Sequence, residues 1–196
     1  MTDNSYIYLI DDEDIIVQIS HNWESFACCN GWEDGCGENA VVGKKIWDFI
    51  QGMETKHFYE EIIRKTRDGC HCGPIPFRCD APGERRYLEL SMTPLASGRI
   101  KITSRIVHAE DRDHVRLLDK CECRSNELVT LCSMCKKMKT APEEWREIEE
   151  GVAQLRIFEA EVMPQVTHGV CPHCHNTVMA ELSALKPLKK NRAARV

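Results

Sequence analysis

The chain has 196 residues, of which 42% are hydrophobic and 29% charged, and its formal net charge is -5. This composition is ordinary for a soluble globular protein, and the length allows one large domain or two small ones. No apolar run approaches the roughly 20 residues that a membrane span needs, and the acidic N-terminus does not resemble a secretory signal. We therefore expect a cytoplasmic protein with no membrane contact.

The charge is unevenly distributed. Residues 1–120 carry 21 acidic and 15 basic side chains, whereas residues 186–196 form a basic tail with five basic and no acidic residues. Phosphate binding depends on clustered Lys and Arg, so the tail is the candidate for nucleic-acid contact. A solvated chain terminus explains the same composition, and we do not expect nucleic acid to be the main partner.

Residues 1–108 have the pattern of an α+β domain. A helix is predicted over residues 54–67, with Phe58, Ile62 and Ile63 as its buried stripe and Asp68-Gly69 at its end. Five segments have strand character and are bounded by turn signals. They are residues 6–10, 15–20, 71–80, 85–95 and 99–108. We expect one five-stranded antiparallel sheet with helices on one face.

This order of elements resembles a PAS domain. The similarity is carried by residues 8–20, 23–30, 76–82 and 85–90, and by the run Val42-Gly43-Lys44-Lys45-Ile46-Trp47-Asp48-Phe49-Ile50. It covers residues 6–108 and implies a sensor domain that binds a small ligand or a partner between its helices and its sheet.

The ligand of this PAS-like domain is unknown. Cys28-Cys29-Asn30 reverses the order of the flavin-attaching motif of PAS photosensors, and no Arg-Phe-Leu follows it, which argues against photochemistry. Haem bound through His21, His57 or His71 stays an alternative, although a lone histidine is more often a surface or core residue.

Residues 109–124 are heavily charged, with Val115, Leu117 and Leu118 as apolar points, and predict a connecting helix or linker. Beyond it we expect a four-cysteine module over residues 125–185. The linker either transmits a signal between the two domains or is a solvated spacer, and both interpretations stay open.

The twelve cysteines need an explanation, because disulfides are rare in a reducing cytosol. Cys132 and Cys135 form one Cys-x-x-Cys turn, and Cys171 and Cys174 form another after 35 intervening residues. Two such turns supply the four thiolates of a tetrahedral metal site. We expect one zinc ion per chain, and the alternatives are free or redox-active thiols and, with less weight, iron bound by the same sulfurs.

Residues 143–162 are predicted to fill the gap between the two turns as an amphipathic helix that begins at a Thr140–Glu143 capping box. Its apolar face would consist of Trp145, Ile148, Val152, Leu155 and Val162. The fold class expected is therefore α+β, a PAS-like sheet followed by a small and mainly helical four-cysteine module.

Three histidines lie close to the second turn: His168, His173 and His175. A histidine near a metal more often hydrogen-bonds to a ligand than binds the ion, and His168 is the first candidate for direct binding. Cys121 and Cys123 are too close together for a standard turn and stay unassigned.

A second resemblance covers residues 128–182. The residues that carry it are 131–139, 144–149 and 167–174. This segment is similar to a module at the C-terminal end of bacterial signalling proteins, where the module follows PAS-like or receiver domains. The similarity implies two-component or related signalling, and no known chemical activity.

Two further groups of residues have plain explanations. Cys70, Cys72 and Cys79 fit buried apolar positions, with a redox-sensing thiol as the alternative. Arg78, Asp80, Arg85 and Arg86 surround a turn and fit a surface charge network better than a recognition patch.

The chain has no phosphate loop, nucleophile elbow or His-Glu-x-x-His helix, so we do not expect an enzyme. We expect a signalling sensor or adaptor that acts through a protein partner, with homodimer formation as one route. The alternatives are a thiol or metal redox switch and a nucleic-acid-binding zinc module that uses the basic tail.

Overall fold

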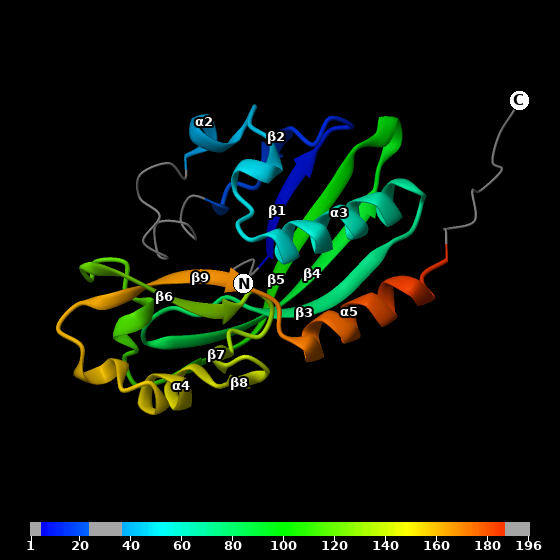
Figure 1. The fold of residues 1–196 in the computed structure, drawn as a ribbon. Coiled ribbons are helices and arrows are strands. Elements are labelled where there is room, and N and C mark those ends of the chain that lie inside the picture. The colour runs from blue at the N-terminus through cyan, green and yellow to red at the C-terminus, as the bar shows by residue number, and fades with distance from the viewer. Residues whose placement is uncertain (1–4, 24–36, 187–196) are drawn as a thin grey trace, which may run out of the picture.

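The computed structural model describes residues 5–23 and 37–186, which form two units, each built around its own sheet (Figure 1). The first unit has a five-stranded antiparallel sheet in the order β2-β1-β5-β4-β3. Its strands are β1 (Ser5–Ile10), β2 (Ile16–Ile19), β3 (Cys72–Arg78), β4 (Glu84–Pro94) and β5 (Ile100–Asp111). The predicted five-stranded antiparallel sheet is confirmed.

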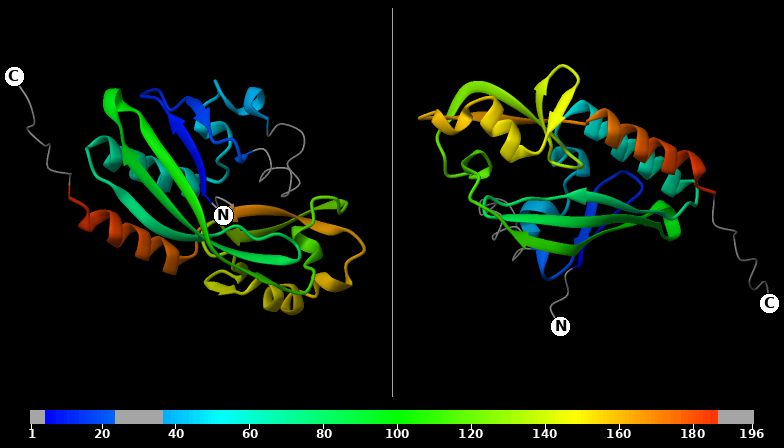
Figure 2. Two further views of the ribbon diagram at one scale, coloured as in Figure 1. Left: turned by 180° about the vertical axis from the view of Figure 1, so that it is seen from behind. Right: turned by 90° about the horizontal axis from the view of Figure 1, so that it is seen from below.

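Helices cover one face of this sheet, as expected (Figure 2, right). The main one, α3 (Met53–Arg67), buries Phe58, Ile62 and Ile63 against β4, which contributes Leu90 and Met92 to the same core. Alternate residues of a strand point to the same face, so Leu90 and Met92 both reach that core. The short helix α2 (Glu38–Val41) and a 3-10 turn at Ile46–Asp48 complete this layer.

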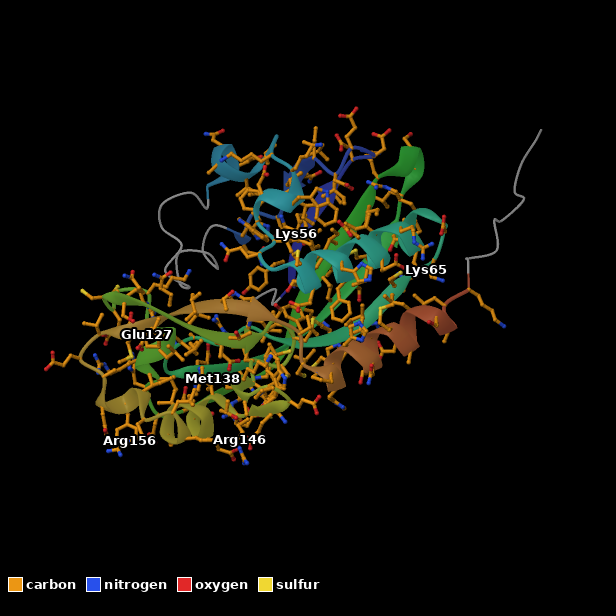
Figure 3. The ribbon with its side chains drawn as sticks, viewed as in Figure 1. Lys56, Lys65, Glu127, Met138, Arg146 and Arg156 are labelled. Atoms are coloured by element: carbon orange, nitrogen blue, oxygen red, sulfur yellow. The ribbon has the colours of Figure 1, made fainter. Side chains whose placement is uncertain are left out.

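The second unit has a four-stranded sheet in the order β8-β7-β6-β9, so the expectation of a mainly helical module is wrong. Its strands are β6 (Arg124–Cys132), β7 (Met138–Ala141), β8 (Glu144–Arg146) and β9 (Met163–Gly169). Met138 is fully buried in its core, whereas Arg146 and Arg156 lie on its outer side (Figure 3). The core also contains Leu131, Ile148 and Met163.

The single helix predicted over residues 143–162 is not formed. Trp145 lies in β8 opposite Lys139 of β7, and the Thr140 hydroxyl donates to Glu144 across this hairpin instead of capping a helix. Only Ile148–Gln154 is α-helical (α4), and a 3-10 turn follows at Ile157–Glu159. Antiparallel pairing with β7 therefore outweighs the helical spacing of the apolar residues.

Residues 109–124 form no α-helix, so of the two expected forms, connecting helix or linker, the helix is wrong. β5 continues to Asp111, because Glu84 and Arg85 of β4 pair with Asp111 and Glu110 and so extend the ladder. After it the chain makes only a 3-10 turn, at Arg116–Leu118. Val115 and Leu117, which gave the segment its helical appearance, are buried in the core of the second unit.

The last helix, α5 (Pro172–Ala184), belongs by sequence to the four-cysteine segment but packs on the first unit. Val178 and Leu182 are buried in the same core as Phe58 of α3. Among the described residues, no helix is long and apolar enough to cross a membrane. Cys28-Cys29-Asn30 and all of the basic tail except Lys186 lie outside the described residues.

Candidate metal centre

The two Cys-x-x-Cys turns meet because β6 and β9 run parallel. Cys132, the last residue of β6, lies opposite Gly169, the last residue of β9. Parallel strands end at the same edge of a sheet, so each strand delivers its turn to the same place. The first turn reverses the chain into β7 with Lys136 at a positive φ of 60°, and the second leads into α5 with Cys171 as its N-cap.

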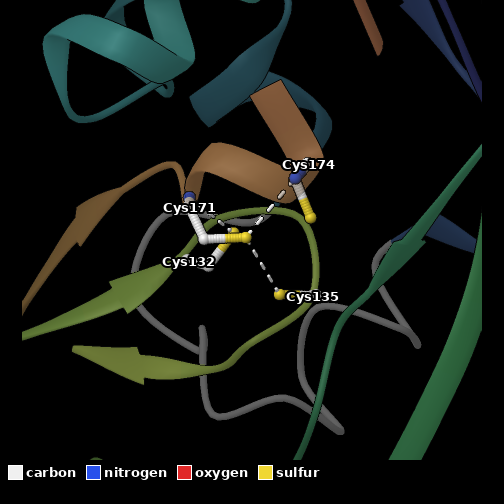
Figure 4. Close-up of side chains that lie close together, drawn as sticks. All are labelled: Cys132, Cys135, Cys171 and Cys174. Carbon is white, nitrogen blue, oxygen red and sulfur yellow. Dashed lines mark hydrogen bonds between the residues drawn. The ribbon is translucent and has the colours of Figure 1, made fainter. Parts of the chain in front are cut away.

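All four predicted ligands are brought together (Figure 4). The sulfur atoms of Cys132, Cys135, Cys171 and Cys174 lie within 4.8 Å of one another. The Sγ atoms of Cys135 and Cys171 are 3.8 Å apart. Metal–sulfur bonds of about 2.3 Å in a tetrahedron place the sulfurs roughly 3.8 Å apart, whereas a disulfide needs about 2.05 Å. The spacing therefore fits four thiolates around one metal ion.

The surroundings of these sulfurs favour negative charge. The backbone N–H of Cys171 donates to Cys132 Sγ at 3.4 Å, and that of Cys174 donates to Cys171 Sγ at 3.5 Å. Hydrogen bonds from the thiols of Cys135 and Cys174 hold the pKa of Cys132 well below its usual value. The same bond to Cys132 raises the pKa of Cys135 to about 12, since it keeps the proton on the donor. Hydrogen bonds to Cys132 and Cys135 likewise raise the pKa of Cys174, so the cluster favours a thiolate on Cys132 with the other two thiols as its donors.

The three neighbouring histidines are not part of this group of ligand atoms. His168 borders a separate polar hollow with Glu54 and Trp145, and burial lowers its pKa. His175 stacks on Phe58 with ring centroids 5.5 Å apart. His168 therefore lies between the units and His175 in the packing of α5 on α3, and the sequence pattern reveals neither position.

The other described cysteines lie elsewhere. Cys70 and Cys72 are buried in the first core, as the plain interpretation expects, and burial raises the pKa of Cys72. Cys79 is half-buried, and Cys121 and Cys123 are exposed. None of the five joins the cluster.

The first turn of the cluster is fastened to the first unit. The backbone N–H of Arg78, at the end of β3, donates to the carbonyl of Met134 at 2.7 Å. Pro76, two residues earlier on this edge strand, has no N–H to offer, so Arg78 provides the outward donor. The hydroxyls of Thr55 on α3 and Ser133 are 2.6 Å apart. The candidate metal centre thus lies at the junction of the two units.

A buried charge network forms the second connection. Arg78 binds both Asp80 and Glu147, and Arg112 binds both Asp80 and Glu149. The Asp80 side chain is 0% exposed. Glu147 is the residue at the N-cap position of α4 and Glu149 lies in its first turn, so the network attaches the start of α4 to the end of the first sheet. The predicted charge network exists, but its centre at Asp80 is buried and its half-exposed glutamates join it to the second unit.

The electrostatics of this network keep Glu149 ionised. Burial alone would raise the pKa of this carboxyl, but a hydrogen bond from its own backbone N–H, the hydrogen bond from Arg85 and the charges of Arg85 and Arg112 lower it overall. Arg85 reaches Glu149 at 2.7 Å and Glu110 at 3.0 Å, which ties β4 and β5 to α4 as well.

Gly52 provides a test of how closely the units approach. It has a φ of 83°, and a Cβ there would lie 2.7 Å from the backbone oxygen of His168 in β9. Gly52→Ala should destabilise the protein by about 1–3 kcal/mol, measured by urea unfolding. Gly69→Ala is the matched control, because its φ is 90° and nothing lies within 4 Å of the added carbon. Equal losses in both variants would show that the contact with β9 contributes nothing.

A small cavity of about 150 Å³ lies between α3 and the sheet. It is bordered by Phe58, Tyr59 and Phe77 from the first unit and by Ser133 and Met134 from the cysteine turn. Burial, followed by the effect of Cys79, raises the pKa of Tyr59 to about 12. Typical ligand pockets have roughly 300–1,000 Å³, so this cavity suits only a small molecule.

The histidines considered as haem ligands do not border that cavity. His57 is exposed on α3, and His71 lies on the surface within hydrogen-bond distance of Thr93.

Comparisons with known proteins identify no family for this α+β chain with a candidate four-thiolate centre. No protein-family model matches the sequence, and no curated protein matches it. Among solved structures, a domain of an HTR-like protein from Haloarcula marismortui ATCC 43049 is similar, with 15% sequence identity and a TM-score of 0.34. The match covers 54% of this chain and 99% of that domain. A similarity at this level does not assign a function.

Proposed function

We propose that this chain is a non-enzymatic signalling sensor or adaptor, in which a PAS-like sensing unit is joined to a unit stabilised by zinc. The observation that carries the proposal is the position of the four-cysteine cluster at the junction. Ser133 and Met134 of the first turn border the cavity under α3, and the same turn is bonded to Thr55 and Arg78. A change in that cavity therefore reaches the metal centre through direct contacts.

Zinc suits this role because four thiolates are its usual structural ligand set, and a closed site stabilises the surrounding fold. The four cysteines would hold the ion, and the ion would supply folding free energy. Iron bound by the same sulfurs is the second choice.

Exposed apolar side chains at the far end of the second unit support the proposal of a protein partner. Leu128 is 66% exposed and Phe158 is 59% exposed, and Leu155 and Val162 are also exposed. Leu128 and Leu155 border one hollow of about 650 Å³. Exposed apolar side chains gathered on one part of a surface are typical of protein–protein contact. We propose that the protein acts in the cytoplasm by presenting this end to a signalling partner.

Metal analysis tests the proposal. Protein purified without chelator or reducing agent should contain about one zinc per chain and show no visible absorption, since zinc has a filled d shell. Elemental analysis and an absorption spectrum of the same sample measure both. A folded sample that contains no metal would contradict the proposal. A coloured sample that contains iron would show that iron, not zinc, is the metal of the site.

The nucleic-acid alternative has its own test. Truncation after Leu185 removes the basic tail, and unchanged affinity for DNA and RNA would eliminate that alternative.

A further inference from the structure

The four sulfurs of the cluster differ in their access to the surface. Cys132 is 0% exposed and Cys171 is 3% exposed, whereas Cys135 and Cys174 are half-buried. Both half-buried cysteines border a pocket of about 420 Å³ on the side of the cluster that faces β3. Two of the four sulfur ligands therefore form part of the wall of a pocket.

The rest of that wall is mainly apolar. Phe77 of β3 and Leu88 of β4 lie on one side of the pocket, and Val178 of α5 lies on the other. Val107 is the extra residue of a bulge in β5, opposite Tyr87 and Leu88, which leaves it 44% exposed at the same pocket. The volume lies within the roughly 300–1,000 Å³ range of small-molecule sites.

Apolar walls and nucleophilic sulfur together define the ligand. Binding to these walls is favourable for a molecule with an apolar body, because each Å² of apolar surface that is buried contributes about 25 cal/mol. The sulfurs react with an electrophilic oxygen, and an organic hydroperoxide carries both features. We propose that this pocket admits small organic hydroperoxides, which oxidise Cys135 and Cys174 to a disulfide and so release the metal. The metal release rests on the proposed metal site.

The reaction balances with the hydroperoxide as the oxidant. One thiolate attacks the terminal peroxide oxygen, the O–O bond breaks, and the leaving alkoxide takes a proton to become an alcohol. The sulfenic acid formed is then attacked by the second thiolate, which makes the S–S bond and expels hydroxide as water. In total, two thiolates, one hydroperoxide and two protons give one disulfide, one alcohol and one water. Cys132 and Cys171 are left as two ligands, too few for a closed site.

The test compares cumene hydroperoxide with hydrogen peroxide on the full chain. Released zinc is followed with a chromogenic chelator, and the disulfide is located by peptide mapping. Zinc should leave about tenfold faster with cumene hydroperoxide, because its phenyl group is buried against the pocket wall. The map should show Cys135 joined to Cys174.

A pair of variants on α5 separates the pocket from general reactivity. Thr177 is exposed and borders the pocket, whereas its exposed neighbour Asn176 does not. Thr177→Trp should fill the pocket and lower the cumene hydroperoxide rate about tenfold, with the hydrogen peroxide rate changed less than about twofold. Asn176→Trp should leave both rates as in the unaltered protein.

Two results would overturn the inference: equal rates with the two oxidants, or equal behaviour of the two tryptophan variants. Zinc content is measured before oxidant is added, so that the two proposals fail separately. A metal-free folded protein contradicts the proposed function, and thiol loss then still reports access to the pocket. A zinc-loaded protein with no preference between oxidants contradicts only this inference.

Discussion

Cys132→Ser should abolish binding of the proposed zinc ion and unfold the second unit. Cys132 is fully buried at the centre of the cluster, where it accepts the N–H of Cys171 and hydrogen bonds from two other cysteines. Structural zinc contributes about 10–16 kcal/mol in small zinc modules, and that free energy is largely folding free energy. Elemental analysis should show a loss of about one zinc per chain, and proteolysis should cut between β6 and β9.

The effect should also reach the first unit. α5 begins at the second cysteine turn, and its Val178 and Leu182 complete the core under α3. Amide hydrogen exchange in α3 should therefore become faster, although its sheet stays formed. Two separate domains joined by a linker, as the sequence pattern predicts, would leave the first unit unchanged, so the exchange result distinguishes that arrangement from the packed one.

Cys123→Ser is the control for the loss of a thiol. Cys123 is exposed and lies outside the cluster, so metal content and unfolding should not change. Retention of zinc and of the second core by Cys132→Ser would show that the four sulfurs do not act as one site.

The first unit could be predicted from sequence because its signals are local. Leu88, Leu90 and Met92 alternate with polar residues along β4, which is the period of a half-buried strand. Asp68 and Gly69 end α3 as expected, with Gly69 at a φ of 90°. The strand β4 pairs with its neighbours in the chain, β3 and β5, as hairpins require, and α3 covers the face of the sheet that they form.

The second unit could not be predicted in the same way. Its central pair, β6 and β9, is parallel, and the two strands are separated by the whole of β7, β8 and α4. Val129-Thr130 and Val166-Thr167 have strand propensity, but no sequence signal near either strand indicates that the two strands pair with each other. The helical spacing of Trp145, Ile148 and Val152 pointed to a continuous helix, but one of these residues belongs to a hairpin.

The convergence of the four cysteines followed from spacing, because a Cys-x-x-Cys turn directs both sulfurs to one point regardless of the fold around it. Its position at the junction did not follow. Arg78 and Glu147 are 69 residues apart, and only the folded arrangement of both units brings the guanidinium within 2.7 Å of that carboxylate. Charged residues in a sequence give no indication of burial, so a surface network was expected.

Asp80→Asn should be strongly destabilising, although Asp80 lies outside the candidate metal centre. The carboxylate is inaccessible to water and binds Arg78 and Arg112, which are themselves only 8% and 6% exposed in their side chains. Removal of one charge from a buried ion network costs about 3–5 kcal/mol, because the remaining charges stay desolvated. Urea unfolding measures this loss. Zinc content should not change, since no ligand is altered.

Glu89→Gln is the matched control, because Glu89 and Arg105 form an ion pair whose side chains are 31% and 56% exposed. An exposed pair contributes about 0–1 kcal/mol, so the control should be nearly neutral. Asp80 and Glu147 both bind Arg78, and the double variant Asp80→Asn with Glu147→Gln should therefore lose less stability than the sum of the single losses. Additive losses would mean that the network does not act as one connection between the units. Non-additive losses together with retained zinc would show that the charge network joins the units independently of the metal. A signal would then have two routes across the junction, one through the charges and one through the cysteine turn.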